Sequence, residues 1–365
     1  MKTKNNKSRR SGAVLAALAL LAVVAVGAFW LLDNRLPAFE TPGVVCIRPE
    51  TTVEEFLVQV DTVLHPFHRS SVIRTLDREL KDYKLCPGSY HIDRKCSARY
   101  FARCVTRGWQ NPVNLVLSGS MRTVESIAAR IASQMMVDRE QMLAALNDDA
   151  LLAKCGIERG KLFSYIIPDT YQMYWSAKPD EILARLKKEY DAYWNEDRTA
   201  AAAAQGLTPY QVSILASIIA EESHIADEYP KIASVYLNRL RKGMKLQACP
   251  TICYIMNYSI RRVLNKHLTI DSPYNTYMYA GLPPGPICVP GKEHLEAVLH
   301  PDPVRYLYFC ADHTFNGRNV FSTTLAEHES KAALYRQALT EYLKRKNSDA
   351  ELETVIVEED VGDEA

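Results

Sequence analysis

The strongest hydrophobic pattern in the chain is an uncharged, mostly apolar run from Ser11 to Leu32. As a helix that rises about 1.5 Å per residue, this run is long enough to cross a hydrocarbon core of about 30 Å. Five basic residues precede it, and Trp30 lies near its far end, where an aromatic ring suits the membrane interface. The pattern predicts a cytoplasmic basic tail over residues 1–10, one transmembrane helix over residues 11–32 and an extracytoplasmic remainder. A cleaved signal peptide is the alternative, but its apolar region is usually only about 7–15 residues long.

Short alternating segments after this run predict a small α+β module over residues 33–117. Strands are indicated at 44–47, 84–92 and 113–117, and helices are indicated after Thr51 and after Ser97. The module contains no group of side chains suited to catalysis, so the chemistry is expected later in the chain.

The most informative segment begins at Thr208 and Pro209, a favourable helix N-cap followed by a favourable first helical residue. At about 100° per residue, four apolar side chains lie within about 60° of Glu222, whereas Glu221 lies about 100° away. These apolar residues are Leu215, Ile218, Ile219 and Ile225. The pattern therefore aims Glu222 at the interior and Glu221 closer to solvent. A desolvated carboxyl has a raised pKa, which keeps part of it protonated near neutral pH.

The alternative for Glu222 is a structural carboxylate paired with a base, because buried Glu is rare without a partner. Arg239 or Arg241 could supply that base from the next predicted helix, which runs from Lys231 to Lys242 and ends at Gly243. From the residues alone the two interpretations are equally good, since ion-pair networks also perturb carboxyl groups.

A loop-rich stretch after this helix combines prolines, tyrosines and amides, which suit a groove that stacks on sugar rings and reads their polar groups. Its candidate substrate-binding residues are Gln247, Tyr274, Asn275, Thr276, Pro283, Pro284 and Gly285. Turn chemistry explains the Pro-Pro-Gly sequence equally well.

Composition sets further limits. The formal net charge of +1 gives no whole-chain attraction to nucleic acid, so a nucleic-acid partner is not expected. The nine cysteines are an odd number without a framework spacing, so they cannot all pair within one chain. Cys249, Cys253 and His267 lack a fourth ligand at a recognisable zinc spacing, and we expect no metal and no cofactor. The acidic stretch within residues 346–365 predicts a flexible, solvated tail.

Several short blocks, in order, resemble the endolytic murein transglycosylases of the MltG or YceG-like family, from the apolar run to about Arg345. The segment 216–222 resembles the family motif Ala-Ser-Ile-Ile-Glu-Lys-Glu, whose last Glu, the proposed catalytic residue, falls on Glu222. Other matching blocks are 168–170, 233–240, 246–247, 274–277, 281–285, 306–309, Phe321 and 325–328. The chain departs from the family at Ala220 and Glu221, where the motif has Glu and Lys, and at Cys249, where the block Leu-Gln-x-Asp-Pro-Thr has Asp.

The resemblance implies an α+β fold with an N-terminal transmembrane helix, a small LysM-like module and a mainly helical catalytic domain with added strands over residues 118–345. It implies a lytic transglycosylase that cuts between N-acetylmuramic acid and N-acetylglucosamine, with Glu222 as acid and base, and leaves 1,6-anhydromuramyl ends. Peptidoglycan glycan strands, the membrane and peptidoglycan synthases are the implied partners. A non-catalytic peptidoglycan-binding anchor of a wall-synthesis complex is the alternative from another class, because fold alone does not prove activity. A lysozyme-like hydrolase would need a second carboxylate near Glu222.

Overall fold

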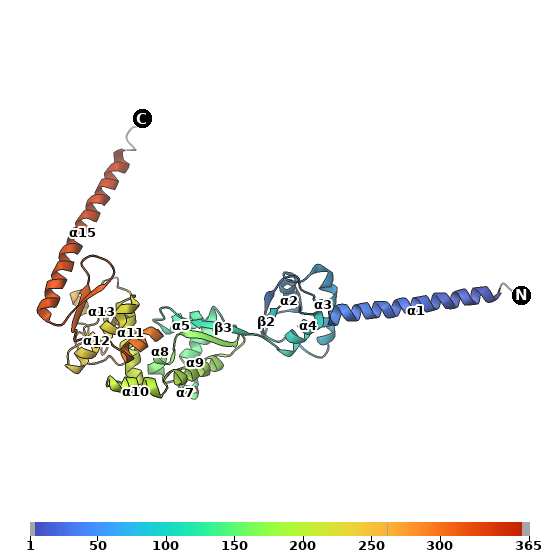
Figure 1. Ribbon diagram of the computed structural model, residues 1–365, viewed down its shortest axis with the longest axis horizontal. Helices are drawn as coiled ribbons and strands as arrows, with labels where there is room; N and C mark the ends of the chain where they lie inside the picture. The colour runs from blue at the N-terminus through green and yellow to red at the C-terminus, as the bar shows by residue number, and fades with distance from the viewer. Residues whose placement is uncertain (1–3, 261, 360–365) are drawn as a thin grey trace. The chain divides into compact units, whose positions relative to one another are not determined.

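The chain folds mainly into helices, with three two-stranded sheets among the residues that the structure describes (Figure 1). The computed structural model describes the backbone of residues 4–260 and 262–359, and the side chains of residues 12–260 and 262–345. Two compact units divide these residues. The first holds the chain up to residue 116 together with 128–142 and 170–181, and the second holds 117–127, 143–169 and the chain from 182 onward. The expected mixture of helices and strands, with helices in the majority, is confirmed.

Helix α1 (Lys4–Asn34) contains the whole apolar run. Its segment Gly12–Asn34 has a mean hydropathy of 2.7, and its most apolar stretch has no buried residue. Length and composition of this kind are those of a membrane span, and a signal sequence shares them.

The first unit is built on the antiparallel pair β1 (Gly43–Ile47) and β2 (Gly88–Ile92). Helices α2 (Val53–Asp61) and α3 (Arg69–Glu79) lie between these strands in sequence, and α4 (Ala98–Arg107) follows them. A capping box at Thr52 begins α2, one residue after the expected position. Ser97 is the N-cap of α4, which begins where the sequence predicts a helix. The core includes three contacting rings, those of Phe39, Phe56 and Phe101.

The next segment pairs β3 (Pro112–Leu117) with β4 (Asp169–Tyr174) and contains α5 (Val124–Ala132) and α6 (Arg139–Leu146). The predicted strand at 113–117 is therefore confirmed. Helix α5 ends at Ala132.

In the second unit, the buried helix α11 packs against α8, α10, α12, α13 and α14. The bounds of the remaining elements are α7 (Asp149–Lys154), α8 (Leu162–Tyr165), α9 (Pro179–Tyr193), α10 (Glu196–Ala204), α11 (Pro209–Glu222), α12 (Tyr229–Arg241), α13 (Cys249–Ile255), α14 (Lys292–Leu299), β5 (Tyr308–Ala311), β6 (Asn319–Ser322) and α15 (Leu325–Glu359). Strands β5 and β6 form an antiparallel hairpin on which α15 packs. The backbone stays helical as far as Glu359, so the acidic stretch predicted as a tail continues α15 to that point, and residues 360–365 lie outside the described range.

Candidate active site

Helix α11 carries Glu222 at its last position. The Thr208 hydroxyl accepts the Gln211 amide N–H while the Gln211 side chain accepts the Thr208 N–H, a capping box that begins the helix as predicted. The side chains of Leu215, Ile218 and Ile219 are fully buried, so the apolar stripe holds over the last two turns. One member of the predicted stripe is wrong. Ile225 lies beyond the helix, because the backbone becomes extended at Ser223 and the helix ends there.

The Glu222 carboxyl lies on the wall of a cavity of about 300 Å³ in the second unit. Its Oε1 accepts a hydrogen bond of 2.6 Å from the hydroxyl of Tyr236, a fully buried residue on α12. Desolvation raises the pKa of Glu222 to about 7, although the Tyr236 hydrogen bond and the positive charge of Arg239 both act to lower it. At neutral pH the Glu222 carboxyl is therefore protonated in about half of the molecules, so it can donate a proton and accept one back.

The two arginines considered as structural partners of Glu222 are bound elsewhere. Arg239 is buried and donates from Nε to the Leu307 carbonyl (2.7 Å) and from Nη1 to the Leu246 carbonyl (2.8 Å). Arg241 bonds to polar side chains at the surface. In the part of the chain that the structure describes, neither forms a salt bridge with Glu222. The guanidinium of Arg239 thus contributes a fixed positive charge to the pocket without neutralising the carboxylate by direct contact.

The neighbouring carboxylate has a different environment. Both oxygens of Glu221 accept hydrogen bonds from the Arg122 guanidinium, at 2.9 and 2.7 Å, and that guanidinium lies 4.8 Å from the ring centroid of Tyr258. The Glu221 side chain is only 10% exposed, because the Arg122 guanidinium covers the carboxylate that the pattern places closer to solvent than Glu222. The helical periodicity correctly predicts that the two carboxylates point in different directions, since Glu221 does not line the Glu222 cavity.

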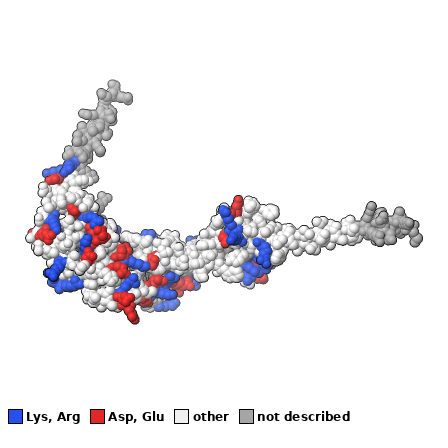
Figure 2. Space-filling view, viewed as in Figure 1, with Lys and Arg blue, Asp and Glu red and all other residues white. Residues whose placement is uncertain are grey.

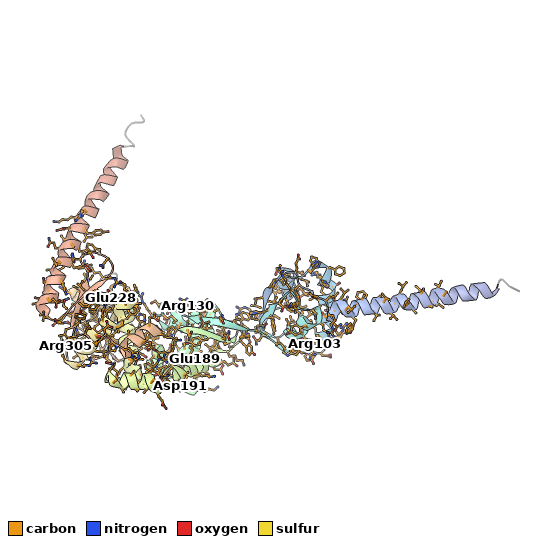
Figure 3. The ribbon with its side chains drawn as sticks, in the orientation of Figure 1. Arg103, Arg130, Glu189, Asp191, Glu228 and Arg305 are labelled. Carbon is orange, nitrogen blue, oxygen red and sulfur yellow. The ribbon has the colours of Figure 1, made fainter. Side chains whose placement is uncertain are left out.

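The turn after Glu222 is held by a third carboxylate. Glu228 is buried and accepts hydrogen bonds from the backbone N–H and the side-chain amide of Asn319, each at 2.8 Å, and from the Ser223 hydroxyl at 3.1 Å. Figure 3 labels Glu228 in the second unit. These bonds tie the residue that follows Glu222 to strand β6 and so restrain the end of α11.

Loop residues close the cavity opposite Glu222. Gln247 lines it in a left-handed backbone conformation, with φ of 52°, and its N–H donates to the Thr276 carbonyl. Cys249 and Tyr277 line it side by side, with 3.0 Å between the thiol sulfur and the phenol oxygen. Burial raises the pKa of both groups, so both stay neutral near neutral pH. The remaining lining residues are Leu246, Phe309 and His328, and burial lowers the pKa of His328 so that its imidazole is neutral.

Of the candidate substrate-binding residues, Gln247 lines the Glu222 cavity and the other six do not. Asn275 is fully buried, where its amide donates to the Leu268 and Ile270 carbonyls and its carbonyl accepts the Tyr277 N–H. Thr276 is also buried, and its hydroxyl accepts the Ala248 N–H. Asn275 and Thr276 therefore hold the loops that carry Gln247 and Tyr277, which makes them positioning residues in this structure.

Tyr274 and the Pro-Pro-Gly turn belong to a different region of the second unit. Tyr274 lines a second cavity of about 440 Å³ together with Tyr254, whose ring centroid is 4.7 Å away. The Pro284 carbonyl accepts a hydrogen bond from the Tyr210 hydroxyl, and Pro283 and Gly285 are buried. A Cβ at Gly285 would lie 2.9 Å from the Tyr274 hydroxyl, so this glycine is needed for the close packing of the turn.

Sequence reasoning missed seven of the cavity residues as site residues. They are Tyr236, Arg239, Leu246, Cys249, Tyr277, Phe309 and His328. Every one lies in a block that carries the family resemblance, so the order of these blocks was the available signal. None of the nine cysteines, all within the described ranges, forms a disulfide, and no group of three or more His, Cys, Asp or Glu in those ranges could hold a metal ion.

Comparison with known proteins identifies the family of this chain. The model of the YceG-like family matches residues 50–333, which is most of the chain. The chain belongs to the YceG-like family. An endolytic murein transglycosylase of Bacillus subtilis strain 168 is 32% identical over 278 residues, which cover 71% of this chain and 74% of that protein. One of Streptococcus pneumoniae D39 is 27% identical over 220 residues, which cover 58% of this chain but only 39% of that protein.

A crystal structure of a YceG-like protein from Listeria monocytogenes has the same fold. It superposes with a TM-score of 0.52 at 24% sequence identity and covers 79% of this chain and 98% of that one. The residues that carry the site in this YceG-like chain, Glu222 and Tyr236, both lie inside the range that the family matches.

Proposed function

We propose that this YceG-like protein is a membrane-anchored lytic transglycosylase that cleaves peptidoglycan glycan strands outside the cytoplasmic membrane. The observation that carries the proposal is the lone carboxyl of Glu222, because the other described residues that line its cavity are neutral or cationic. The names of the relatives in Bacillus subtilis and Streptococcus pneumoniae support the same class of enzyme.

In the first step, Glu222 acts as a general acid. Because Oε1 accepts the Tyr236 hydroxyl proton, Oε2 is the oxygen that carries the acidic proton toward the substrate. This proton passes to the glycosidic oxygen between N-acetylmuramic acid and N-acetylglucosamine as the bond from C1 to that oxygen breaks. The pKa of about 7 supports the role, since an acid whose pKa lies near the working pH is both available and strong enough.

In the second step, the carboxylate of Glu222 acts as a general base. It removes the proton from the C6 hydroxyl of the same muramyl sugar, and the C6 oxygen bonds to C1 to give a 1,6-anhydromuramyl end. The acid is regenerated and no water is consumed. The nucleophile is tethered to the reacting sugar, so proximity replaces the second carboxylate that most glycoside hydrolases use to activate water or attack C1.

The parts outside the cavity fit an enzyme that works at the membrane on new strands. Helix α1 would anchor the chain with its basic start in the cytoplasm. The order β1, α2, α3, β2 with an antiparallel strand pair supports a LysM-like module within residues 33–117, followed by a catalytic domain over 118–345 and an acidic tail over 346–365. Cleavage of nascent strands would end their elongation, which makes peptidoglycan synthases the expected partners.

Mass spectrometry of the products from purified peptidoglycan tests the proposal. Anhydromuramyl ends are expected from the parent protein and not from the Glu222→Gln variant. Reducing ends would instead identify a hydrolase, and the absence of products from a folded protein that still binds the strands would identify a non-catalytic anchor.

A further inference from the structure

We propose that the α3–α4 face of the module lies against the headgroups of an anionic membrane. The proposal rests on the role of α1 as a membrane anchor, and it concerns residues that take no part in the chemistry at Glu222. The residues of α3, α4 and the β2–α4 turn that adjoin the end of α1 are here called the basic face.

A buried ion-pair cluster joins the end of α1 to the module. Asp33 is only 3% exposed and accepts hydrogen bonds from Ser71 (2.5 Å) and from Arg74 (2.5 and 3.1 Å), with Arg78 at 3.8 Å. Asn34 accepts a further bond of 2.5 Å from Arg99 on α4. Separating these groups would leave a buried carboxylate unpaired, which is costly. The helix and the module are therefore one body, with no flexible linker between the apolar run and the folded unit.

The contacts of Asp33 set how the module meets the membrane. Ser71, Arg74 and Arg78 are spaced along two turns of α3, so α3 lies across the end of α1, as its label beside that end in Figure 1 also indicates. The Arg74 guanidinium lies 4.8 Å from the ring centroid of Phe29, which belongs to the apolar segment. An arginine that stacks on the outer end of a membrane-spanning helix lies at the depth of the headgroups.

This face stays positively charged after its ion pairs are taken into account. Arg74 and Arg78 share the single carboxylate of Asp33. In the same way, Arg103 and Arg107 share Glu79, and Arg103 is labelled in Figure 3 beneath the module. Each pair of arginines therefore carries one positive charge in excess.

Additional cations surround the end of α1. Arg35 and Lys95 line a polar cavity of about 540 Å³ that also has one carboxylate, Asp93. Lys81 lines a groove with Arg74 and Arg78, in which Asp77 is the one carboxylate, so cations outnumber carboxylates in both hollows. In contrast, the charged residues of α2 are all acidic, namely Glu54, Glu55 and Asp61, of which Asp61 pairs with Arg69 at the start of α3. Figure 2 shows blue groups gathered where α1 joins the module. This asymmetry favours an anionic lipid surface over a zwitterionic one.

Attraction of this kind acts only at short range, because the Debye length is about 8 Å at physiological ionic strength. The helix supplies the proximity, and the basic face then supplies the orientation. The module should consequently be held flat against the bilayer in anionic lipid and released from it in zwitterionic lipid or at high salt.

The test uses the full chain in lipid nanodiscs and measures how fast an uncharged amine-reactive acetylating reagent labels individual lysines. Lys81 and Lys95 report on the basic face. A Val58→Lys substitution at an exposed position of α2 adds a reporter on the acidic side. In discs that contain phosphatidylglycerol, labelling of Lys81 and Lys95 should be slower than in phosphatidylcholine discs by about threefold or more, with the lysine at position 58 unchanged. The difference should vanish at about 1 M salt, where the Debye length is about 3 Å.

Two variants complete the experiment. Arg94 is an exposed residue of the β2–α4 turn. Replacing Arg35 and Arg94 together with Gln should reduce the protection of both reporters, whereas Glu54→Gln on α2 should leave it unchanged. Equal labelling rates in the two lipids, with the protein still embedded in the discs, would overturn the inference while leaving the anchor and the enzyme assignment intact. Failure of the chain to remain with the discs would instead count against the anchor itself.

Discussion

Replacing Glu222 with Gln removes the carboxyl group but keeps the shape of the side chain and an oxygen that can accept the Tyr236 hydrogen bond. The parent carboxyl has a pKa of about 7 in the folded protein against an ordinary value of 4.5. Each pKa unit corresponds to about 1.4 kcal/mol, so the folded state disfavours the ionised form by about 3 kcal/mol. Partial exposure of the carboxyl to the cavity places the expected effect at about 1–3 kcal/mol.

The sign follows from proton binding. The folded protein holds the Glu222 proton more tightly than the unfolded chain, so this group lowers the free energy of unfolding as pH rises from about 4.5 to about 7. Above that range its effect is constant. Gln does not titrate, so the variant should match the parent near pH 4.5 and exceed it by about 1–3 kcal/mol at about pH 8.

The catalytic activity of the Glu222→Gln variant should fall, although its stability at about pH 8 should rise. General acid and base catalysis contributes about 10²–10⁴-fold, and here one group performs both steps, so the loss should reach or exceed the upper end of that range. Thermal unfolding across this pH range and product analysis on the same detergent-solubilised samples measure both effects. Glu221→Gln is the matched control, because it changes the adjacent carboxylate, which lies outside the cavity, and most activity should remain.

Two results would refute this reasoning. If the Glu222→Gln variant released anhydromuramyl ends at nearly the parental rate, the catalytic assignment would fail. If it lost about 3–5 kcal/mol of stability at every pH, Glu222 would be a structural ion-pair partner instead.

Three further substitutions test the surroundings of Glu222. Tyr236→Phe removes the hydrogen bond that lowers the pKa of Glu222, so the alkaline limb of the kcat/KM profile should move to higher pH. Arg122→Gln leaves the Glu221 carboxylate without its partner and should lower the free energy of unfolding by about 1–2 kcal/mol, measured by thermal unfolding. The loss is smaller than for a fully buried pair because the Arg122 side chain is 42% exposed, and adding Glu221→Gln should restore part of it. Asn275→Ala should lower turnover and melting temperature together, since three buried hydrogen bonds are lost; lower turnover at an unchanged melting temperature would show that Asn275 acts on the substrate instead.

The sequence was most informative where one local pattern decides the structure. The apolar run of α1, the helix that starts at Ser97, the N-cap at Thr208 and the strand at 113–117 can all be predicted from neighbouring residues, and the structure confirms them. Helix α3 was not predicted, because the polar residues Ser71, Thr75 and Glu79 interrupt the apolar positions Val72 and Leu76 on its buried face. Ser71 and Glu79 are buried because Asp33 and the arginines of α4, respectively, bond to them, which is a tertiary effect.

The cavity residues also depend on tertiary contacts that the sequence pattern does not predict. Periodicity indicates that Glu222 faces apolar surroundings, but it cannot show that Tyr236, on another helix, reaches its oxygen. A polar loop residue such as Asn275 suits ligand binding and loop packing equally, and only the completed fold separates the two roles. The boundaries of the two units could not be predicted from the order of residues either. Residues 128–142 and 170–181 belong to the first unit, although segments of the second unit precede and follow them in the sequence.

Two of the three departures from the family blocks, Glu221 and Cys249, can be explained together from the structure of the cavity. Glu221, where the family has Lys, is neutralised by Arg122 away from the cavity, so its charge does not add to that of Glu222. Cys249, where the family block has Asp, lines the cavity as a neutral thiol whose pKa is raised by burial. A carboxylate at that position would repel the ionised form of Glu222 and raise its pKa further. In this chain desolvation alone is enough to bring the pKa of Glu222 to about 7, so the closure of the cavity around this one side chain is what prepares it for acid and base catalysis.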